Sequence, residues 1–394
     1  MGFISDIIFK RFSIPPTLSL LTVGFILTNI FHLFDSEMIL IFAPYFGTMA
    51  FAIILFEGGL ALDIYSLVKK LGIAFLFGTL IFLLTAISLA IFWILFGGDP
   101  YIGAIIGIML GGISGAIVIP IISKLKVSEE VKTVAKMEAV LAEIYIIVGV
   151  SVILGMIKGE GDFNIPSYFF NSIVNSTLIG IFVGLVWLQA IKFLVKNEIY
   201  YILTLAVLFG TYWFVEFIHA NGPLAALVLG MVISNTEKVV ARVLPFLRID
   251  EERVRILNFS IDEFTRQVSV ELSFVFSTFF FLILGMVVKL DYLLDWNVLS
   301  AIFGFSLIII IIRAFVTFLV YLIDKDIKRN REVLTLFFMM PRGLVTAIVA
   351  FNVGSVLPQY ANLLLSYAFG VILVSVIIMT FGIFLTRYFV GGEQ

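Results

Sequence analysis

Apolar blocks about as long as a bilayer is thick recur along almost the entire chain, and this feature limits the fold more than any other. A helix needs about 20 predominantly apolar residues to cross the hydrocarbon core of a membrane. Hydrophobic residues make up 61% of the 394 residues and charged residues only 13%, whereas a soluble domain has about 25% charged residues. The sequence therefore predicts an all-α polytopic membrane protein without a soluble domain.

About twelve of these blocks are long enough to be transmembrane helices. We expect the spans at residues 14–34, 38–60, 71–97, 101–123, 134–157, 168–191, 198–218, 221–236, 267–288, 297–323, 334–355 and 359–386. Residues 1–394 are then expected to form a single transmembrane domain.

The basic residues segregate to one side of these expected spans. Of the 25 Lys and Arg residues, Lys158 and Lys289 fall in segments on the far side, Arg313 and Arg342 fall within spans, and all the others lie on the side of the N-terminus. Because Lys and Arg accumulate in short cytoplasmic loops, we expect a multi-pass protein of the cell (plasma) membrane with both termini in the cytoplasm. The same rule explains the basic loops without any nucleic acid partner.

Several chemistries are excluded by composition. The sequence contains no Cys and only two His residues, so it offers no disulfide, no thiolate metal site and no Cys nucleophile. No segment resembles a nucleotide-binding loop, a kinase motif or a Ser/His/Asp arrangement. We therefore expect neither an enzyme nor a bound cofactor, and any transport would draw its energy from an ion gradient.

Four of the ionisable residues in the expected spans form one candidate group: Glu138, Glu143, Arg313 and Arg342. A charge at the bilayer centre costs at least about 2.5–3.5 kcal/mol, so it must be paired, hydrated or functional. At about 1.5 Å per residue, Glu143 lies roughly 14 Å deep in the fifth span, and Arg313 and Arg342 reach similar depths in the tenth and eleventh spans. Glu138 lies nearer the cytoplasm. We expect the four side chains to meet in one region, Glu138 and Arg313 as an ion pair between helices and Glu143 as the group that titrates.

Two spans contain residues that interrupt helices. The fourth contains Gly111, Gly112 and Gly115, and the eleventh contains Pro341 and Gly343. Unwound backbone at mid-membrane is tolerated where it lines a cavity or is buried in protein, although glycines also permit a close helix crossing. The fourth and eleventh spans are seven apart. Because consecutive spans alternate in direction, spans an odd number apart cross the membrane in opposite directions. The pattern therefore predicts inverted-topology repeats with crossed broken helices at spans 4 and 11.

Several motifs, in order along nearly the whole chain, resemble the monovalent cation:proton antiporters of the NhaP and sodium/proton exchanger type. These motifs are residues 10–16 (KRFSIPP), 56–60 (FEGGL), 119–124 (IPIISK) running on to 137–139, 222–230 (GPLAALVLG), Arg313 and 341–343 (PRG). The first of them is similar to the approach to the family's second helix, so the family's first helix is expected to be missing.

The resemblance also assigns roles to single residues. Family members have Glu-Ser-x-x-Asn-Asp in the fifth span, where this chain has Glu138-Ala-Val-Leu-Ala-Glu143. Glu138 is then expected to pair with Arg313, and Glu143 to replace the aspartate that carries the ion or the proton. The family's Thr-Asp-Pro in the fourth span corresponds to Ile113-Ser114-Gly115. One carboxylate of the family's site is therefore absent, which leaves two carboxylates against two guanidiniums.

The family likeness implies a secondary active antiporter that exchanges a monovalent cation for H⁺, with Na⁺ as the leading candidate. Glu143, Ser114 and Glu138 would form the ion or proton site, with Arg313 and Arg342 as charge partners and no metal other than the transported cation. A core within residues 71–157 and 297–386 would move against a scaffold formed by the remainder, and the family pairs as homodimers in the lipid bilayer.

Two alternatives remain open at this stage. In the first, the altered site carries a different solute on the same fold, such as K⁺ or a small organic anion attracted by Arg342. The other alternative is a relative that does not transport and acts as a membrane subunit or sensor, because the fold alone does not determine the function.

Overall fold

The computed structural model describes residues 16–60, 64–158, 165–194, 200–218, 220–235, 263–323 and 330–390. In these residues all regular structure is helical and no strand occurs. Seven helices are long and apolar enough to cross a membrane, and five shorter apolar helices accompany them. The predicted all-α polytopic fold with about twelve spans is confirmed.

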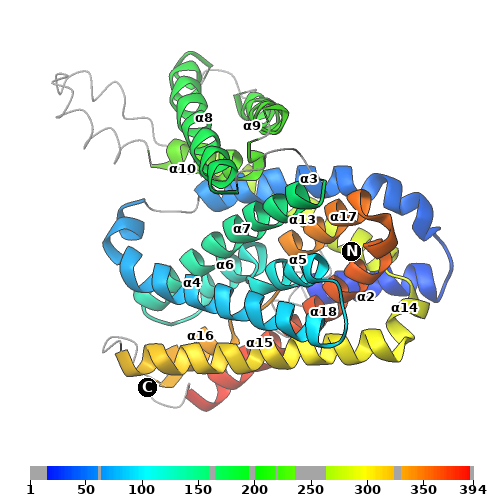
Figure 1. Cartoon of the computed structure of the whole chain (residues 1–394). Helices are drawn as coiled ribbons and strands as arrows, with labels where there is room; N and C mark the ends of the chain where they lie inside the picture. Colours follow the sequence, from blue (N-terminus) through cyan, green and yellow to red (C-terminus); the bar gives the residue numbers. More distant parts are fainter. Residues whose placement is uncertain are drawn as a thin grey trace. The chain divides into compact units, whose positions relative to one another are not determined.

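The helices follow the expected order of spans (Figure 1). The first five spans correspond to α2 (Pro16–Asn29), α3 (Ser36–Leu60), α4 (Ile64–Leu95), α5 with α6 (Pro100–Gly111 and Gly115–Lys124) and α7 (Glu129–Lys158). The remaining spans correspond to α8 (Ile165–Leu194), α9 (Tyr200–Phe217), α10 (Gly222–Ser234), α13 (Glu263–Val287), α15 (Trp296–Ile323), α16 with α17 (Asn330–Phe338 and Leu344–Val356) and α18 (Ala361–Val390). The short helices α14 (Leu290–Leu294) and η2 (Pro358–Tyr360) lie between them.

Some helices extend beyond the apolar blocks that predicted them. Helix α7 begins at Glu129 rather than at residue 134, and α4 begins at Ile64 rather than at residue 71. Hydropathy marks the residues that lie in hydrocarbon, whereas a polar turn continues the same backbone hydrogen bonds into the interface. In α7 the added turn carries Glu129 and Glu130, whose negative charges interact favourably with a helix N-terminus.

Two spans are interrupted where the sequence predicted. Helix α5 ends at Gly111 and α6 starts at Gly115. Helix α16 ends at Phe338 and α17 starts at Leu344. Residues between the paired half-helices leave backbone groups without partners in their own helix, so each break must find hydrogen bonds elsewhere.

The chain divides into two compact units. The first contains residues 1–48, 70–161 and 277–394, and both broken spans belong to it. The second contains residues 49–69 and 162–276.

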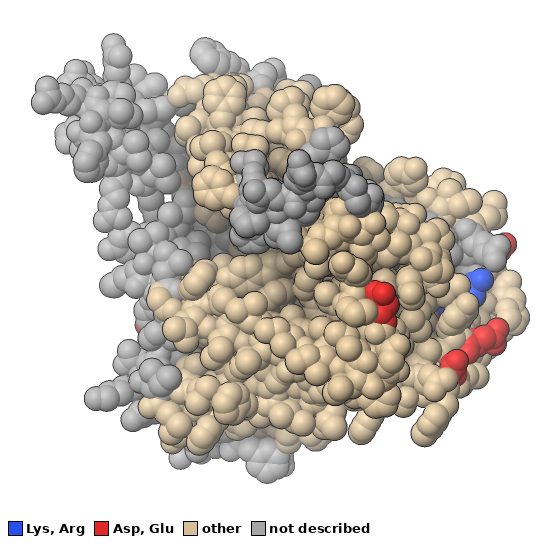
Figure 2. Space-filling view, viewed as in Figure 1, with Lys and Arg blue, Asp and Glu red and all other residues tan. Residues whose placement is uncertain are grey.

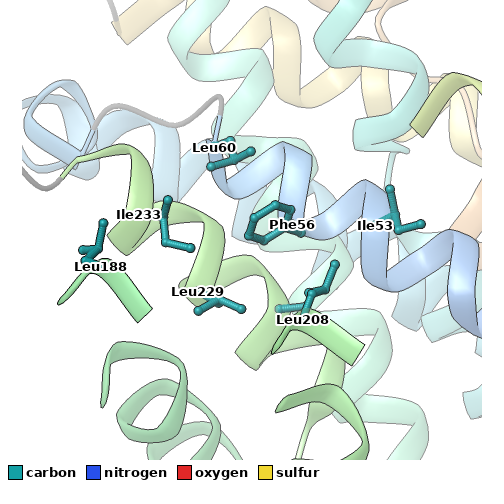
Figure 3. Packing of buried hydrophobic residues seen from close by; sticks show 8 residues of the cluster. Ile53, Phe56, Leu60, Leu188, Leu208, Leu229 and Ile233 are labelled. Carbon is teal, nitrogen blue, oxygen red and sulfur yellow. The ribbon is translucent and has the colours of Figure 1, made fainter. Parts of the chain in front are cut away.

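The second unit is organised around α10, whose residues from Gly222 to Gly230 are all buried. The helix starts at a side-chain cap, because Asn221 accepts a hydrogen bond from the N–H of Leu224 at 2.8 Å. Leu229 and Ile233 of α10 pack with Phe56 of α3 and with residues of α8 and α9 in one apolar cluster (Figure 3). This cluster is the core of the unit.

Glycines allow two pairs of helices to approach backbone to backbone. In the second unit a Cβ at Gly59 of α3 would overlap the carbonyl oxygen of Leu227, and a Cβ at Gly230 of α10 would overlap that of Phe56. In the first unit Gly24 of α2 and Gly285 of α13 face the carbonyl oxygens of Leu282 and Leu21 in the same reciprocal way. Small residues permit such close packing where lipid, not water, surrounds the helices.

The described surface is largely apolar, as a lipid-facing surface must be. Figure 2 shows one face on which charged side chains are few. On α8, Leu178, Phe182 and Leu185 are exposed at helical spacing, and on α15 Phe303, Ile311 and Phe318 are exposed. Exposed apolar stripes of this kind fit contact with acyl chains.

Candidate functional site

The two broken spans meet at their breaks. The backbone N–H of Ser114, between α5 and α6, donates to the carbonyl oxygen of Pro341 at 2.9 Å. Next to this link the Thr346 hydroxyl donates to the carbonyl oxygen of Met109 at 3.1 Å. The second break therefore supplies an acceptor to the first, and α17 supplies a donor to α5. The predicted crossing of broken helices is confirmed.

Glycines make room for this crossing. A Cβ at Gly343 would overlap the Ser114 hydroxyl, so a larger residue there would displace Ser114. A Cβ at Gly112 would lie 2.6 Å from the Cβ of Ala142 on α7. The absence of side chains at positions 112 and 343 lets α7 and the second break come close to the first.

The carboxylate of Glu143 lies at the N-terminus of α6. Its side chain projects from α7, is 4% exposed, and its Oε1 accepts a hydrogen bond from the backbone N–H of Gly115 at 2.8 Å. The N-terminus of a helix carries unpaired N–H groups and a partial positive charge. This half-helix end therefore compensates part of the charge of the ionised carboxylate.

The Ser114 hydroxyl lies one residue before this contact. The residue is 2% exposed, and its Oγ is buried without a hydrogen-bond partner among the described residues. A buried hydroxyl usually has a partner, so an unpaired one in a native structure marks a place for a water, an ion or strain. The pair of Glu143 and Ser114 offers oxygen ligands of the kind that a monovalent cation binds.

Glu138 and Arg313 form a buried ion pair between α7 and α15. The two residues are 2% and 1% exposed, and Arg313 Nε also donates to the carbonyl oxygen of Leu336 on α16 at 3.0 Å. The guanidinium carbon lies 5.4 Å from the centre of the Phe77 ring on α4. Arg313 thus contacts three other helices, which is the arrangement of a structural pair.

Arg342 binds backbone oxygens rather than a carboxylate. Its Nε donates to the carbonyl oxygen of Leu110 at 2.9 Å, and Nη1 donates to that of Met340 at 2.7 Å. A longer contact of 3.4 Å joins Nη2 to the carbonyl oxygen of Gly111. Leu110 and Gly111 are the last residues of α5, so the guanidinium lies at the negative end of that half-helix.

The expectation that four charged groups form one cluster is therefore only partly met. The structure joins Glu138 to Arg313, but among the described residues neither Glu138 nor Glu143 forms an ion pair with Arg342. Half-helix ends provide the opposite partial charges instead. A linear sequence shows the depth of a charge but not which backbone groups the break exposes.

Three contributors were missed by sequence reasoning. The hydroxyl of Ser375 on α18 accepts a hydrogen bond from the backbone N–H of Arg342 at 3.0 Å. Thr346 links α17 to α5, and the carbonyl oxygen of Leu336 accepts from Arg313. Hydroxyl residues inside apolar blocks are a signal that could have pointed to Ser375 and Thr346, since they need partners in lipid. A carbonyl acceptor has no signal in the sequence.

Comparisons with known proteins agree with this fold. A family model described as "Sodium/hydrogen exchanger, transmembrane" matches residues 2–387. The chain is also similar to two structures of the sodium proton antiporter MjNhaP1 from Methanocaldococcus jannaschii. The structure at pH 8 has a TM-score of 0.77 and the electron-microscopy structure one of 0.79, each at 20% identity over 100% of this chain and 96% of that chain. A search of curated proteins gives no match.

Proposed function

The chain belongs to the sodium/hydrogen exchanger family, and on this premise we propose that it is a secondary active antiporter exchanging a monovalent cation, Na⁺, for H⁺. The observation that carries this proposal is the carboxylate of Glu143, buried at the break between α5 and α6 beside an unpaired hydroxyl. An ionisable residue at membrane depth is expensive and is typically functional.

The exchange rests on one carboxylate with two alternative partners. Ionised Glu143 binds the cation together with the Ser114 hydroxyl and carbonyl oxygens of the break, or it binds a proton and becomes neutral. Both loaded states then carry the same net charge. The single carboxylate therefore supports electroneutral exchange of one cation for one proton.

The two arginines would serve this site without binding the cation. Arg342 compensates the negative end of α5, and Arg313 neutralises Glu138. A cation in the site then meets Glu143, which has no ion-pair partner in the described part of the chain. We assign Glu138 a structural role and Glu143 the transport role.

Transport further requires that the site face each side of the membrane in turn. We propose that a core within residues 71–157 and 297–386 moves against the remainder of the chain. Both parts of that core belong to the same compact unit, which is consistent with movement as one body. We also propose a plasma-membrane protein with cytoplasmic termini, assembled as a homodimer.

The test is ion-driven proton flux in proteoliposomes with an internal pH dye. An inward Na⁺ gradient should drive proton efflux in the wild type, and Glu143→Gln should abolish it while Glu143→Asp retains part of it. Glu138→Gln serves as a comparison within the same helix. Flux in Glu143→Gln equal to that of the wild type would refute the mechanism, and flux driven by K⁺ but not by Na⁺ would reassign the cation.

A further inference from the structure

The contact between Gly115 and Glu143 has two separate components. The first is the hydrogen bond from the Gly115 N–H to Glu143 Oε1 at 2.8 Å. The second is space, because a Cβ at position 115 would lie 3.0 Å from Oε1 and 3.3 Å from both Cδ and Oε2. Among the described residues Glu143 Oε2 has no hydrogen-bond partner. The carboxylate is therefore held through one of its two oxygens.

We propose that Gly115 is a positioning residue for the exchange inferred above: its N–H holds Oε1 of Glu143 and leaves Oε2 as the oxygen offered to the cation or the proton. The effect of Gly115 on transport rests on the proposed function, whereas its hydrogen bond to Glu143 does not. A hydrogen bond to the charged form favours that form over the protonated one. The Gly115 N–H therefore helps a cation to compete with protons for Glu143.

The charged groups around Glu143 do not provide this effect. Of the helices that pack on α7, α5 and α17 carry no charged side chain, α6 carries only Lys124 at its last turn, and α16 carries Arg331 and Glu332 near its start. Helix α4 carries Lys69 and Lys70 near its start, and α15 carries Arg313. On α7 itself Glu138 is paired with Arg313, and Tyr145 is hydrogen-bonded to Thr79. Arg342, in the break before α17, binds the carbonyl oxygens of α5 and Met340.

Position 115 allows the donor to be removed without a change of backbone. Gly115 is the first residue of α6, and Ser114 before it is extended with φ −92° and ψ 120°. Proline is favoured at the first position of a helix and requires an extended residue before it. Gly115→Pro therefore fits the backbone, but it lacks the N–H and adds a ring that includes the crowding Cβ. Gly115→Ala adds the same Cβ and keeps the N–H, so the comparison of the two variants separates the lost donor from the crowding.

The first experiment compares these two variants in proteoliposomes. Gly115→Pro should raise the half-saturating Na⁺ concentration near neutral pH on the order of tenfold, with a smaller effect at alkaline pH, because a charge-assisted hydrogen bond is lost. Gly115→Ala should keep the pH dependence of the wild type even if its maximal rate falls. Gly210→Ala on α9, where a Cβ meets nothing within 4 Å, is the control for glycine replacement.

The second experiment needs no transport. Ser114-Gly115 is the only Ser-Gly step in the sequence, so labelling Ser with ¹³C at the carbonyl and Gly with ¹⁵N gives one amide signal in nuclear magnetic resonance. In the full-length protein in nanodiscs this signal should move as Glu143 titrates and should stay fixed over the same pH range in Glu143→Gln.

The outcomes separate the two proposals. If the wild type carries no ion but the Gly115 signal follows Glu143, the antiporter proposal fails and the positioning role stands. If the signal is independent of pH in the wild type, or if Gly115→Pro and Gly115→Ala change the pH dependence equally, the positioning role is refuted. Should Gly115→Pro fail to fold, the labelled wild type still decides.

Discussion

Arg342 and Glu143 bind the two ends of the same break. In the described part of the chain the guanidinium of Arg342 forms no ion pair but donates to the last carbonyls of α5, and the carboxylate of Glu143 accepts from the first N–H of α6. Half-helix ends carry about half an elementary charge of opposite sign. One positive and one negative side chain therefore match the dipoles of one interrupted span.

Replacing Arg342 tests this match. Arg342→Ala leaves the carbonyl oxygens of Leu110 and Met340 without their donors, and each unpaired buried group costs about 1–3 kcal/mol. We expect the unfolding temperature in detergent to fall by several degrees and flux to be lost. Arg342→Lys keeps the charge but not the planar fork and should be intermediate. A fully stable Arg342→Ala protein would contradict the capping role.

The ion pair of Glu138 and Arg313 is predicted to be structural. Removing one partner of a buried pair costs about 3–5 kcal/mol, because the other charge is left uncompensated. Glu138→Gln and Arg313→Met should each destabilise the protein, and the double variant should recover much of the loss. The measurement is thermal unfolding of all three proteins. Destabilisation by the double variant equal to the sum of the single ones would count against this pair.

Ser114 is predicted to bind the cation but not the proton. Ser114→Ala removes one oxygen ligand and should raise the half-saturating Na⁺ concentration several-fold, with proton uptake by Glu143 retained. Saturating Na⁺ should restore most of the flux. The control is Ser123→Ala on α6, whose hydroxyl is exposed and bonded to the carbonyl oxygen of Ile119. Equal effects of the two substitutions would remove Ser114 from the site.

Adjacent glycines on α3 provide a matched pair for the backbone crossing. Gly59→Ala would push a Cβ against the carbonyl of Leu227, whereas a Cβ at Gly58 meets nothing within 4 Å. Overpacking costs typically about 1–3 kcal/mol, and Ala in place of an open helical Gly gains up to about 1 kcal/mol. Unfolding temperatures should therefore fall for Gly59→Ala and stay level or rise for Gly58→Ala.

The sequence predicted the order of the spans because each apolar block alone must satisfy its backbone as a helix in lipid. It also located both interruptions, since the clustered glycines near position 112 and Pro341 disfavour a continuous helix. Helix ends such as Glu129 of α7 were less well predicted, because hydropathy reports contact with hydrocarbon and not the end of hydrogen bonding.

The site was predicted less completely than the fold. Depth along a span suggested that Glu138 and Arg313 could meet, and the structure contains that pair. The partners of Arg342 and Glu143 are backbone groups, which exist only once the half-helices are in place. Backbone carries no residue identity, so spacing in the sequence does not reveal such contacts.

The two reciprocal glycine contacts described above have a consequence for the repeats. In terms of spans, α2 and α13 are the first and ninth, and α10 and α3 are the eighth and second. Spans 1 and 8 are seven apart, and so are spans 2 and 9. The inverted repeat therefore relates the contact of α2 with α13 to the contact of α10 with α3, and the same glycine contact occurs twice, in opposite orientations. At both joints the glycines face backbone atoms, and such contacts gain nothing from sodium and lose nothing to acid. These parts of the framework should keep their spacing while the composition of the cytoplasm changes.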